Sequence, residues 1–233
     1  MTHMMRFTHP SVAVAIALVC FGCQNGRFDI VPSQEAYKVA IACCSNFQEL
    51  TYTKLATGRA TGVTIMASDQ AYAFSTGISY FKAFELPTLQ PKSEIVIESA
   101  EVISPGVGTF FFYPLVTFLD NSKQVIATVN QPAQIPVLPA SNHLGMTQST
   151  IEFHIALDDY LAARYVIIHT AASLVGAPHQ VIYHNDAQLS PLVPPIVSIL
   201  DAAKGPDLTT TIPGSPVAPA SVLQIEIRKS TAK

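Results

Sequence analysis

Short segments in which apolar and polar residues alternate restrict the fold of this chain more than any other feature. In residues 222–228, Leu223, Ile225 and Ile227 would face a core, and the residues between them are polar. A period of two is typical of a β-strand with one buried face. Six other segments have strand character, namely residues 79–86, 94–98, 109–119, 124–129, 150–157 and 164–170. Strands of this kind predict a mainly β protein, a two-sheet antiparallel β-sandwich of the jelly-roll or immunoglobulin-like type.

The segment of residues 109–119 is apolar almost throughout and contains Pro114. We expect a buried strand with a bulge or bend at the proline, which cannot donate to a strand ladder. Residues 120–122, Asp-Asn-Ser, are typical of a turn. Residues 124–129 would then return as the second arm of a hairpin.

Between residues 176 and 220 the alternation fades, and eight prolines occur from Pro178 to Pro219. We expect a long Pro-rich excursion from the sandwich, with a short helix at residues 195–204. Long ordered excursions tend to be functional or to cover a sheet edge.

The N-terminal stretch has the composition of an export signal peptide. Arg6 supplies a positive charge, and the apolar run of residues 11–19 is too short to anchor the chain across a bilayer. The run leads to Gly22 and Cys23, and a small residue directly before a cysteine resembles the cleavage site of bacterial lipoprotein signal peptidase. This resemblance implies removal of residues 1–22 and acylation of the Cys23 sulfur; an ordinary secretory signal is the alternative. Gln24 favours the periplasmic face of the outer membrane, since an aspartate there would indicate inner-membrane retention.

The rest of the chain is predicted to be one domain on a lipidated tether. The polar residues 23–36 would hold a domain of residues 37–229 off the membrane, with residues 230–233 as a tail. Charged residues make up 12% of the chain and hydrophobic residues 49%, which excludes a disordered protein. Loss of Arg6 with the signal would change the net charge from −3 to −4, which offers no electrostatic footprint for nucleic acid.

Cys43 and Cys44 are neighbours in a chain that has four cysteines. They would keep the remaining free sulfurs if Cys20 left with the signal and Cys23 carried lipid. Because the periplasm is oxidising, unpaired thiols are disfavoured there. A vicinal disulfide, a bridge to another chain and a pair of buried thiols are the three alternatives. A zinc site would need further Cys or His residues at matched spacing, and none is nearby.

No constellation of residues predicts catalysis, so we expect a non-enzymatic protein without a cofactor or metal. Ser79 and Lys82 match the Ser-x-x-Lys motif of penicillin-binding enzymes, but the partner motifs are missing and the pair lies in a predicted strand. Other polar groups lack the spacing typical of metal or acid–base chemistry, and these are His179, His184 and Asp186, the adjacent Asp158 and Asp159, and the mid-strand His154 and His169.

A glycan-binding sandwich would stack sugar rings on flat aromatic faces, and the chain has 8 Tyr and 12 Phe but no Trp. Five tyrosines are better placed for a surface than the phenylalanines of residues 110–112, namely Tyr37, Tyr52, Tyr72, Tyr160 and Tyr183. A tyrosine tip that reaches water is also normal packing. The residues of a ligand site therefore stay unassigned.

Several local strings resemble the maltose-operon periplasmic protein (MalM) family. They are "FQELTYTKL", "FKAFELP", "FFYPLVTFLDNSKQ", "ARYVIIHTA" and, after a Pro-rich approach, "SVLQIEIRK", and they cover most of residues 43–228. The longer family pattern continues with a Pro/Ala linker and a helical tail that this sequence does not contain. The resemblance implies a periplasmic β-sandwich associated with maltose and maltodextrin uptake, and it supplies no catalytic residues.

We therefore expect a lipid-anchored periplasmic protein that is accessory to carbohydrate uptake and a candidate for glycan binding. The alternative is a structural lipoprotein that docks onto a larger cell-envelope assembly, such as a transport or secretion complex, through its Pro-rich excursion or an apolar sheet face.

Overall fold

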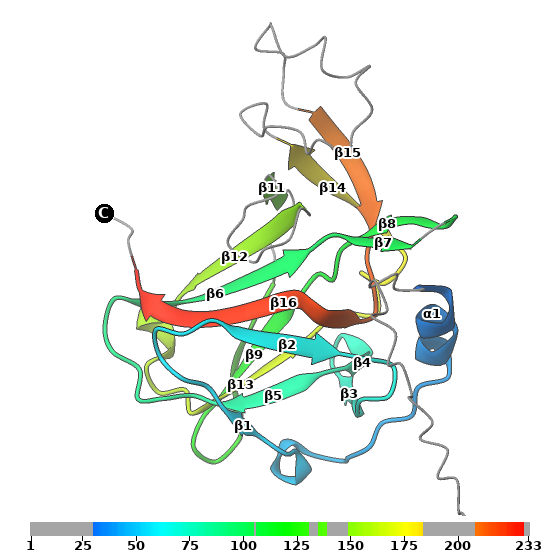
Figure 1. The fold of residues 1–233 in the computed structure, drawn as a ribbon. Coiled ribbons are helices and arrows are strands. Elements are labelled where there is room, and N and C mark those ends of the chain that lie inside the picture. The colour runs from blue at the N-terminus through cyan, green and yellow to red at the C-terminus, as the bar shows by residue number, and fades with distance from the viewer. Residues whose placement is uncertain (1–29, 105, 131–134, 139–148, 184–207, 231–233) are drawn as a thin grey trace, which may run out of the picture.

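The chain is mainly β, with two principal sheets that face each other in the manner of a sandwich (Figure 1). This computed structural model describes residues 30–104, 106–130, 135–138, 149–183 and 208–230. Cys23, the first half of the expected tether and the helix expected at residues 195–204 lie outside the described residues. The predicted fold class is confirmed.

The larger sheet has seven strands. In spatial order they are β15 (Leu208–Pro213), β14 (Pro178–Tyr183), β11 (Ile135–Leu138), β12 (Thr150–Ala156), β6 (Ser93–Ala100), β16 (Ala218–Lys229) and β2 (Thr61–Ile65). All neighbouring pairs are antiparallel except β11 and β14, which run parallel.

The smaller sheet has five strands. In spatial order they are β1 (Thr53–Lys54), β5 (Lys82–Glu85), β13 (Tyr165–His169), β9 (Leu115–Leu119) and β10 (Val125–Val129). The pair β1 and β5 is parallel and the others are antiparallel. The Asp120 carboxylate accepts hydrogen bonds from the backbone of Ser122 and Gln124, which confirms the predicted turn between β9 and β10.

Two short ribbons and three short helices complete the described structure. The ribbons are β3 (Ala71–Phe74) with β4 (Gly77–Tyr80), and β7 (Val102–Ser104) with β8 (Gly108–Phe110). The helices are α1 (Ile30–Lys38), η1 (Phe47–Glu49) and η3 (Asp158–Tyr160).

The main core fills the space between the sheets. Leu223, Ile225 and Ile227 of β16 are at most 2% exposed, as the alternation predicts. They belong to one cluster with Phe118 of β9 and Ile168 of β13, which come from the five-stranded sheet. Burial of such side chains contributes roughly 1.5–3 kcal/mol each, so this core dominates the stability of the fold.

The outer face of the seven-stranded sheet carries charged side chains. The Arg228 Nε donates to Glu94 Oε1 at 2.9 Å, and His154 lies 3.3 Å from the other Glu94 oxygen and 3.1 Å from Glu152. Glu94 is largely buried beneath them, and burial alone would raise its pKa. The hydrogen bonds from Arg228 and His154 outweigh burial and hold the pKa of Glu94 below its usual value.

The outer face of the five-stranded sheet is covered instead by protein. The covering residues and the strand residues beneath them form a second apolar cluster, which we call the outer aromatic cluster. Its buried members are Leu50, Tyr72, Phe74, Phe81, Ala83, Leu119 and Ile167. Four partly buried residues pack against it, namely Cys44, Phe47, Tyr52 and Tyr165.

The buried His169 lies beside this cluster. Its ring stacks on Phe74 at a centroid distance of 3.7 Å, and its Nε2 lies 3.0 Å from the Thr117 hydroxyl. Burial lowers the pKa of His169 to about 4, so the imidazole is neutral at pH 7.

The expected tether is wrong from Ile30 onward, because α1 begins there and is part of the domain. Ile30 is fully buried against Val102 and Phe110, and its backbone N–H donates to the Ser104 hydroxyl at 3.3 Å. Further along, the Tyr37 hydroxyl donates to the Ile78 carbonyl at 2.6 Å. The apolar contacts of Ile30 explain why this segment folds onto the ribbon and does not remain an extended spacer.

Two expected strands are divided in the structure. Residues 79–86 split at the buried Phe81, because β4 pairs in a ribbon with β3 while β5 joins the five-stranded sheet. Residues 109–119 form the end of β8 and all of β9, with Pro114 in the gap between them. This gap is the break that the proline predicts, and residues 110–119 are buried throughout.

The Pro-rich segment contains two long strands that the sequence did not predict. β14 and β15 pair along their whole length, from Pro178 opposite Pro213 to Tyr183 opposite Leu208, and extend the larger sheet. The expected excursion is therefore sheet at both of its ends.

Candidate binding cleft

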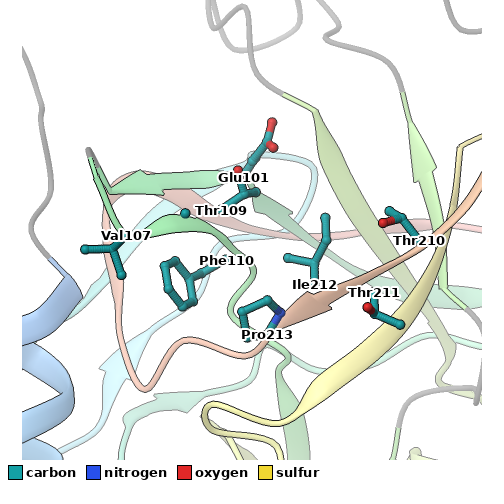
Figure 2. Close-up of a pocket in the computed structure, with 9 residues that line it drawn as sticks. Glu101, Val107, Thr109, Phe110, Thr210, Thr211, Ile212 and Pro213 are labelled. Carbon is teal, nitrogen blue, oxygen red and sulfur yellow. The ribbon is translucent and has the colours of Figure 1, made fainter.

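The described residues contain an open cleft of about 390 Å³ between the β7–β8 ribbon and β15 (Figure 2). Its lining residues come from these two regions of the chain and are Glu101, Val107, Gly108, Thr109, Phe110, Thr210, Thr211, Ile212 and Pro213. The cleft combines one carboxylate, three hydroxyls and several apolar side chains.

Two strand edges form the walls of the cleft. β15 is the last strand of the seven-stranded sheet, and β8 pairs with β7 in a separate ribbon. Just beyond β8, the chain joins β15: Phe111 donates to the Pro213 carbonyl at 3.3 Å, and Ser215 donates to the Phe111 carbonyl at 2.7 Å. Backbone hydrogen bonds therefore join the chain at one end of the two strands, and the strands diverge from there toward the cleft.

Close backbone packing fixes this junction. A Cβ added to Gly214 would clash with the Leu174 carbonyl, so glycine is needed where β15 leaves the sheet. The hydroxyl of the fully buried Tyr113 donates to the Ile212 carbonyl at 3.0 Å. Both contacts fix the C-terminal end of β15, which borders the cleft.

Glu101 is the titratable group of the cleft. Burial raises its pKa above the usual value of a glutamate, while hydrogen bonds from the Thr109 hydroxyl and the Ser149 backbone act in the opposite direction and do not cancel the effect. Figure 2 shows the Glu101 carboxylate beside Thr109 at the rim of the cleft. A ligand donor that reaches this carboxylate would meet an acceptor that is already partly desolvated.

The apolar part of the cleft lies below this carboxylate. Phe110 and Ile212 are almost fully buried and form the floor, whereas Val107 is 48% exposed at the outer end. Thr210 and Thr211 add hydroxyls from β15, the second exposed and the first partly so. The cleft can therefore accept and donate hydrogen bonds around a small apolar surface.

The two adjacent cysteines are bonded to each other, so the vicinal disulfide is the alternative that the structure contains. The backbone N–H of Cys43 donates to the Ala71 carbonyl at 2.8 Å, which attaches this segment to β3. Cys43 is exposed, and Cys44 packs against the outer aromatic cluster. Neither residue lines the cleft.

The tyrosines considered for a sugar surface do not line the cleft either. Tyr72 is buried, and the side chain of Tyr183 lies outside the described residues. Tyr37 and Tyr52 are held by backbone carbonyls, and burial raises the pKa of each to about 12. Tyr160 stacks on Phe118 at 4.5 Å. The described rings among these tyrosines therefore contact other parts of the protein and do not form a flat surface for a sugar.

The remaining polar candidates are dispersed. Ser79 is fully buried and accepts from the Thr170 backbone, whereas Lys82 pairs with Asp69 at 2.7 Å. Asp158 accepts from the Lys92 backbone, and Asp159 is exposed.

The part of the chain that the structure describes contains no group of three or more His, Cys, Asp or Glu residues arranged to hold a metal. His179 packs against Tyr113 and lies 3.3 Å from the Leu174 carbonyl, while His184 and Asp186 are outside the described residues. Within the described residues, no helix has the length and apolar character needed to cross a bilayer.

No family model matches this chain, and neither a curated protein nor a solved structure is significantly similar to it. The cleft residues Glu101, Thr109 and Thr210 were missed by sequence reasoning. One signal was present, because the run Thr209-Thr210-Thr211-Ile212 is β-branched throughout and favours a strand.

Proposed function

We propose that this protein is a non-enzymatic, lipid-anchored periplasmic protein that binds a glycan and is accessory to carbohydrate uptake. The observation that carries the proposal is the cleft, in which the desolvated Glu101 carboxylate and three threonine hydroxyls surround an apolar floor. Its volume of about 390 Å³ falls in the range of small-molecule sites, roughly 300–1,000 Å³.

The chemistry of a sugar ring is complementary to this lining. Each ring offers several hydroxyls that both donate and accept, and its C–H groups form an apolar patch. Glu101 would accept from a pair of sugar hydroxyls, and Thr109 and Thr210 would exchange hydrogen bonds with their neighbours. Phe110 and Val107 would contact the C–H groups.

Two features support the location. Gly22-Cys23 after an apolar run resembles a lipoprotein cleavage site, and the disulfide between Cys43 and Cys44 suits an oxidising compartment such as the periplasm. The resemblance to the maltose-operon periplasmic protein family suggests maltodextrins as the first ligands to test.

Calorimetric titration of the purified chain with maltodextrins and with peptidoglycan fragments tests the glycan site. We expect binding of one of them, weakened at least about tenfold by Glu101→Ala, since a charge-assisted hydrogen bond contributes about 1.5–3 kcal/mol. The exposed acid Asp159 provides the matched control, and Asp159→Ala should bind as the parent does. Absence of both heat and a thermal shift with either ligand would contradict the proposal.

Fractionation of cells tests the anchor separately. Cys23→Ser removes the acylated sulfur, so the variant should move from the membrane to the soluble periplasmic fraction. A variant that stays with the membrane would show that the lipoprotein reading is incorrect.

The edge strand β10 favours a second candidate function, docking onto a larger envelope assembly. Val125 is 51% exposed and Ile126 is 38% exposed on this outermost strand of the five-stranded sheet. An apolar edge strand can pair with a strand of another protein. Crosslinking in mild detergent should then capture a partner through β10, and a monomer without any partner would count against this function.

A further inference from the structure

Three exposed aliphatic residues belong to α1 and the β7–β8 ribbon, two elements that contact each other through Ile30. Val31 is 42% exposed, Ile103 is 53% exposed and Val107 is 48% exposed. We call these three residues the apolar rim. Val39 and Ile41, which follow α1, are more exposed than these residues, and Val125 is exposed to a similar degree. What distinguishes the rim is that its three residues lie on two elements in contact with each other, and a group of exposed aliphatic residues indicates a contact surface.

Contacts of the neighbouring residues join the two elements that carry the rim. Ile30, next to Val31, packs on Val102 and Phe110 and donates to the Ser104 hydroxyl. Ile103 lies between Val102 and Ser104 in β7, and Val107 is in the turn of the same ribbon. Figure 1 shows this ribbon projecting from the sandwich beside α1.

The rim also lacks charge. Residues 30–34 and 102–119 contain no Asp, Glu, Lys or Arg. By contrast, the outer face of the seven-stranded sheet carries several charged side chains. An uncharged projection with aliphatic side chains is suited to the boundary between lipid headgroups and acyl chains.

The covalent chain fixes where this surface can lie. Ile30 follows Cys23 by seven residues, and an extended chain spans at most 3.3–3.6 Å per residue, so the start of α1 lies within about 25 Å of Cys23. With Cys23 acylated, the start of α1 therefore stays within this distance of the membrane surface, which places the apolar rim within reach of it.

We propose that the apolar rim rests in the interface of the membrane that holds the anchor. This inference depends on the proposed lipidation of Cys23. Val102 and Ser104 contact Ile30 of α1, so Ile103 lies on the other, exposed face of the ribbon, and this is the face that would meet lipid when the ribbon tip enters the interface. Because Val107 also lines the cleft, the cleft then opens beside the headgroups, where it would receive a glycan from along the membrane surface.

A single tryptophan reports the contact, because the chain has none of its own. Ile103→Trp and the control Val125→Trp replace residues of nearly equal exposure, 53% and 51%, on different sheets. The acylated full-length mature protein is placed in vesicles of phosphatidylethanolamine and phosphatidylglycerol with brominated acyl chains. We expect the tryptophan at 103 to be quenched and that at 125 to remain bright.

A second measurement separates the rim from the anchor. In the unacylated Cys23→Ser chain, Val31→Ser with Ile103→Ser should weaken partition into the same vesicles about tenfold, and Val125→Ser with Ile126→Ser should leave it unchanged. Vesicle flotation and intact mass establish acylation independently. If the acylated protein floats but position 103 is not quenched, or both positions are quenched equally, the rim proposal is overturned and the anchor stands. If no acyl group is found, the anchor fails, and the rim proposal fails with it unless the partition still depends on Val31 and Ile103.

Discussion

The two sheets share one core but differ on their outer faces. The seven-stranded sheet presents Glu94, His154 and Arg228 on its outer side, whereas the five-stranded sheet is covered by the outer aromatic cluster. The difference is visible in the sequence. β16 alternates between buried and partly exposed residues, while all five residues of β9 are buried. Alternation therefore reports a sheet face that is open, and its absence reports a strand that is buried on both sides.

The largest expected effect comes from removing a residue that covers the five-stranded sheet. Phe74→Ala should lower the free energy of unfolding by about 4 kcal/mol, because it deletes a ring that contacts Tyr72, Phe81 and the His169 ring. Glu226→Ala, on the outer face of the other sheet, should change it by less than about 0.5 kcal/mol. Urea unfolding measures both, and similar losses for the two variants would remove the distinction between the faces.

The buried imidazole of His169 makes the covered face sensitive to acid. Its folded-state pKa of about 4 lies below the ordinary 6.5, so the unfolded chain takes up a proton first as the pH falls. The contribution to stability is complete above pH 6.5 and is lost between pH 6.5 and about 4, a loss of about 3 kcal/mol. His169→Gln should unfold with a flatter dependence on pH over this range. If the unfolding free energy of the variant depends on pH as steeply as that of the parent, a group other than His169 is responsible for the loss of stability.

On the open face, the ion pair of Glu94 should matter more than an ordinary surface pair. Arg228→Ala leaves Glu94, whose side chain is 8% exposed, with His154 as its remaining ion-pair partner among the described residues, and should cost about 1–2 kcal/mol. Lys38→Ala breaks a pair with Glu35 in which both side chains are about two-thirds exposed, 66% and 65%, and should cost less than about 0.5 kcal/mol. Equal effects in chemical denaturation would mean that burial of Glu94 does not strengthen its pairing.

The smallest effect is expected for the disulfide. A bond between adjacent residues closes almost no loop, so it restricts the unfolded chain very little. Cys43→Ser with Cys44→Ser should alter the unfolding free energy by less than about 1 kcal/mol, and reductant should have a similarly small effect on the parent. Loss of several kcal/mol would show that this segment is essential to the cover of the five-stranded sheet.

Local patterns predicted the central strands of the sandwich well, but they did not predict α1 or the pair β14 and β15. The alternation in β12 and β16 and the turn after β9 were sufficient to place those elements. The polar residues around Pro32 predict a tether where α1 is found, although proline is tolerated in the first turn of a helix. What decides this segment is the contact of Ile30 with the distant Val102, which no local pattern contains.

The strands β14 and β15 were missed because prolines marked their segment as irregular. Pro178 begins β14 and Pro213 ends β15, and the two lie opposite each other at the end of the ladder. A proline at a strand end or sheet edge costs few ladder bonds. The cleft could not be predicted at all, because Glu101 and Thr210 are distant in sequence and meet only through the sheet topology.

The central position of β16 has a consequence for how the protein is made. β16 lies between β6 and β2, where Ile225 is opposite Ile97 on one side and Thr61 on the other. In the described sheet β2 pairs with β16, so β2 cannot complete this pairing until residues 218–229 have been synthesised. While residues 66–217 are being made, β2 therefore has no partner strand in this sheet, and β6 lacks one of its two neighbours until β16 follows.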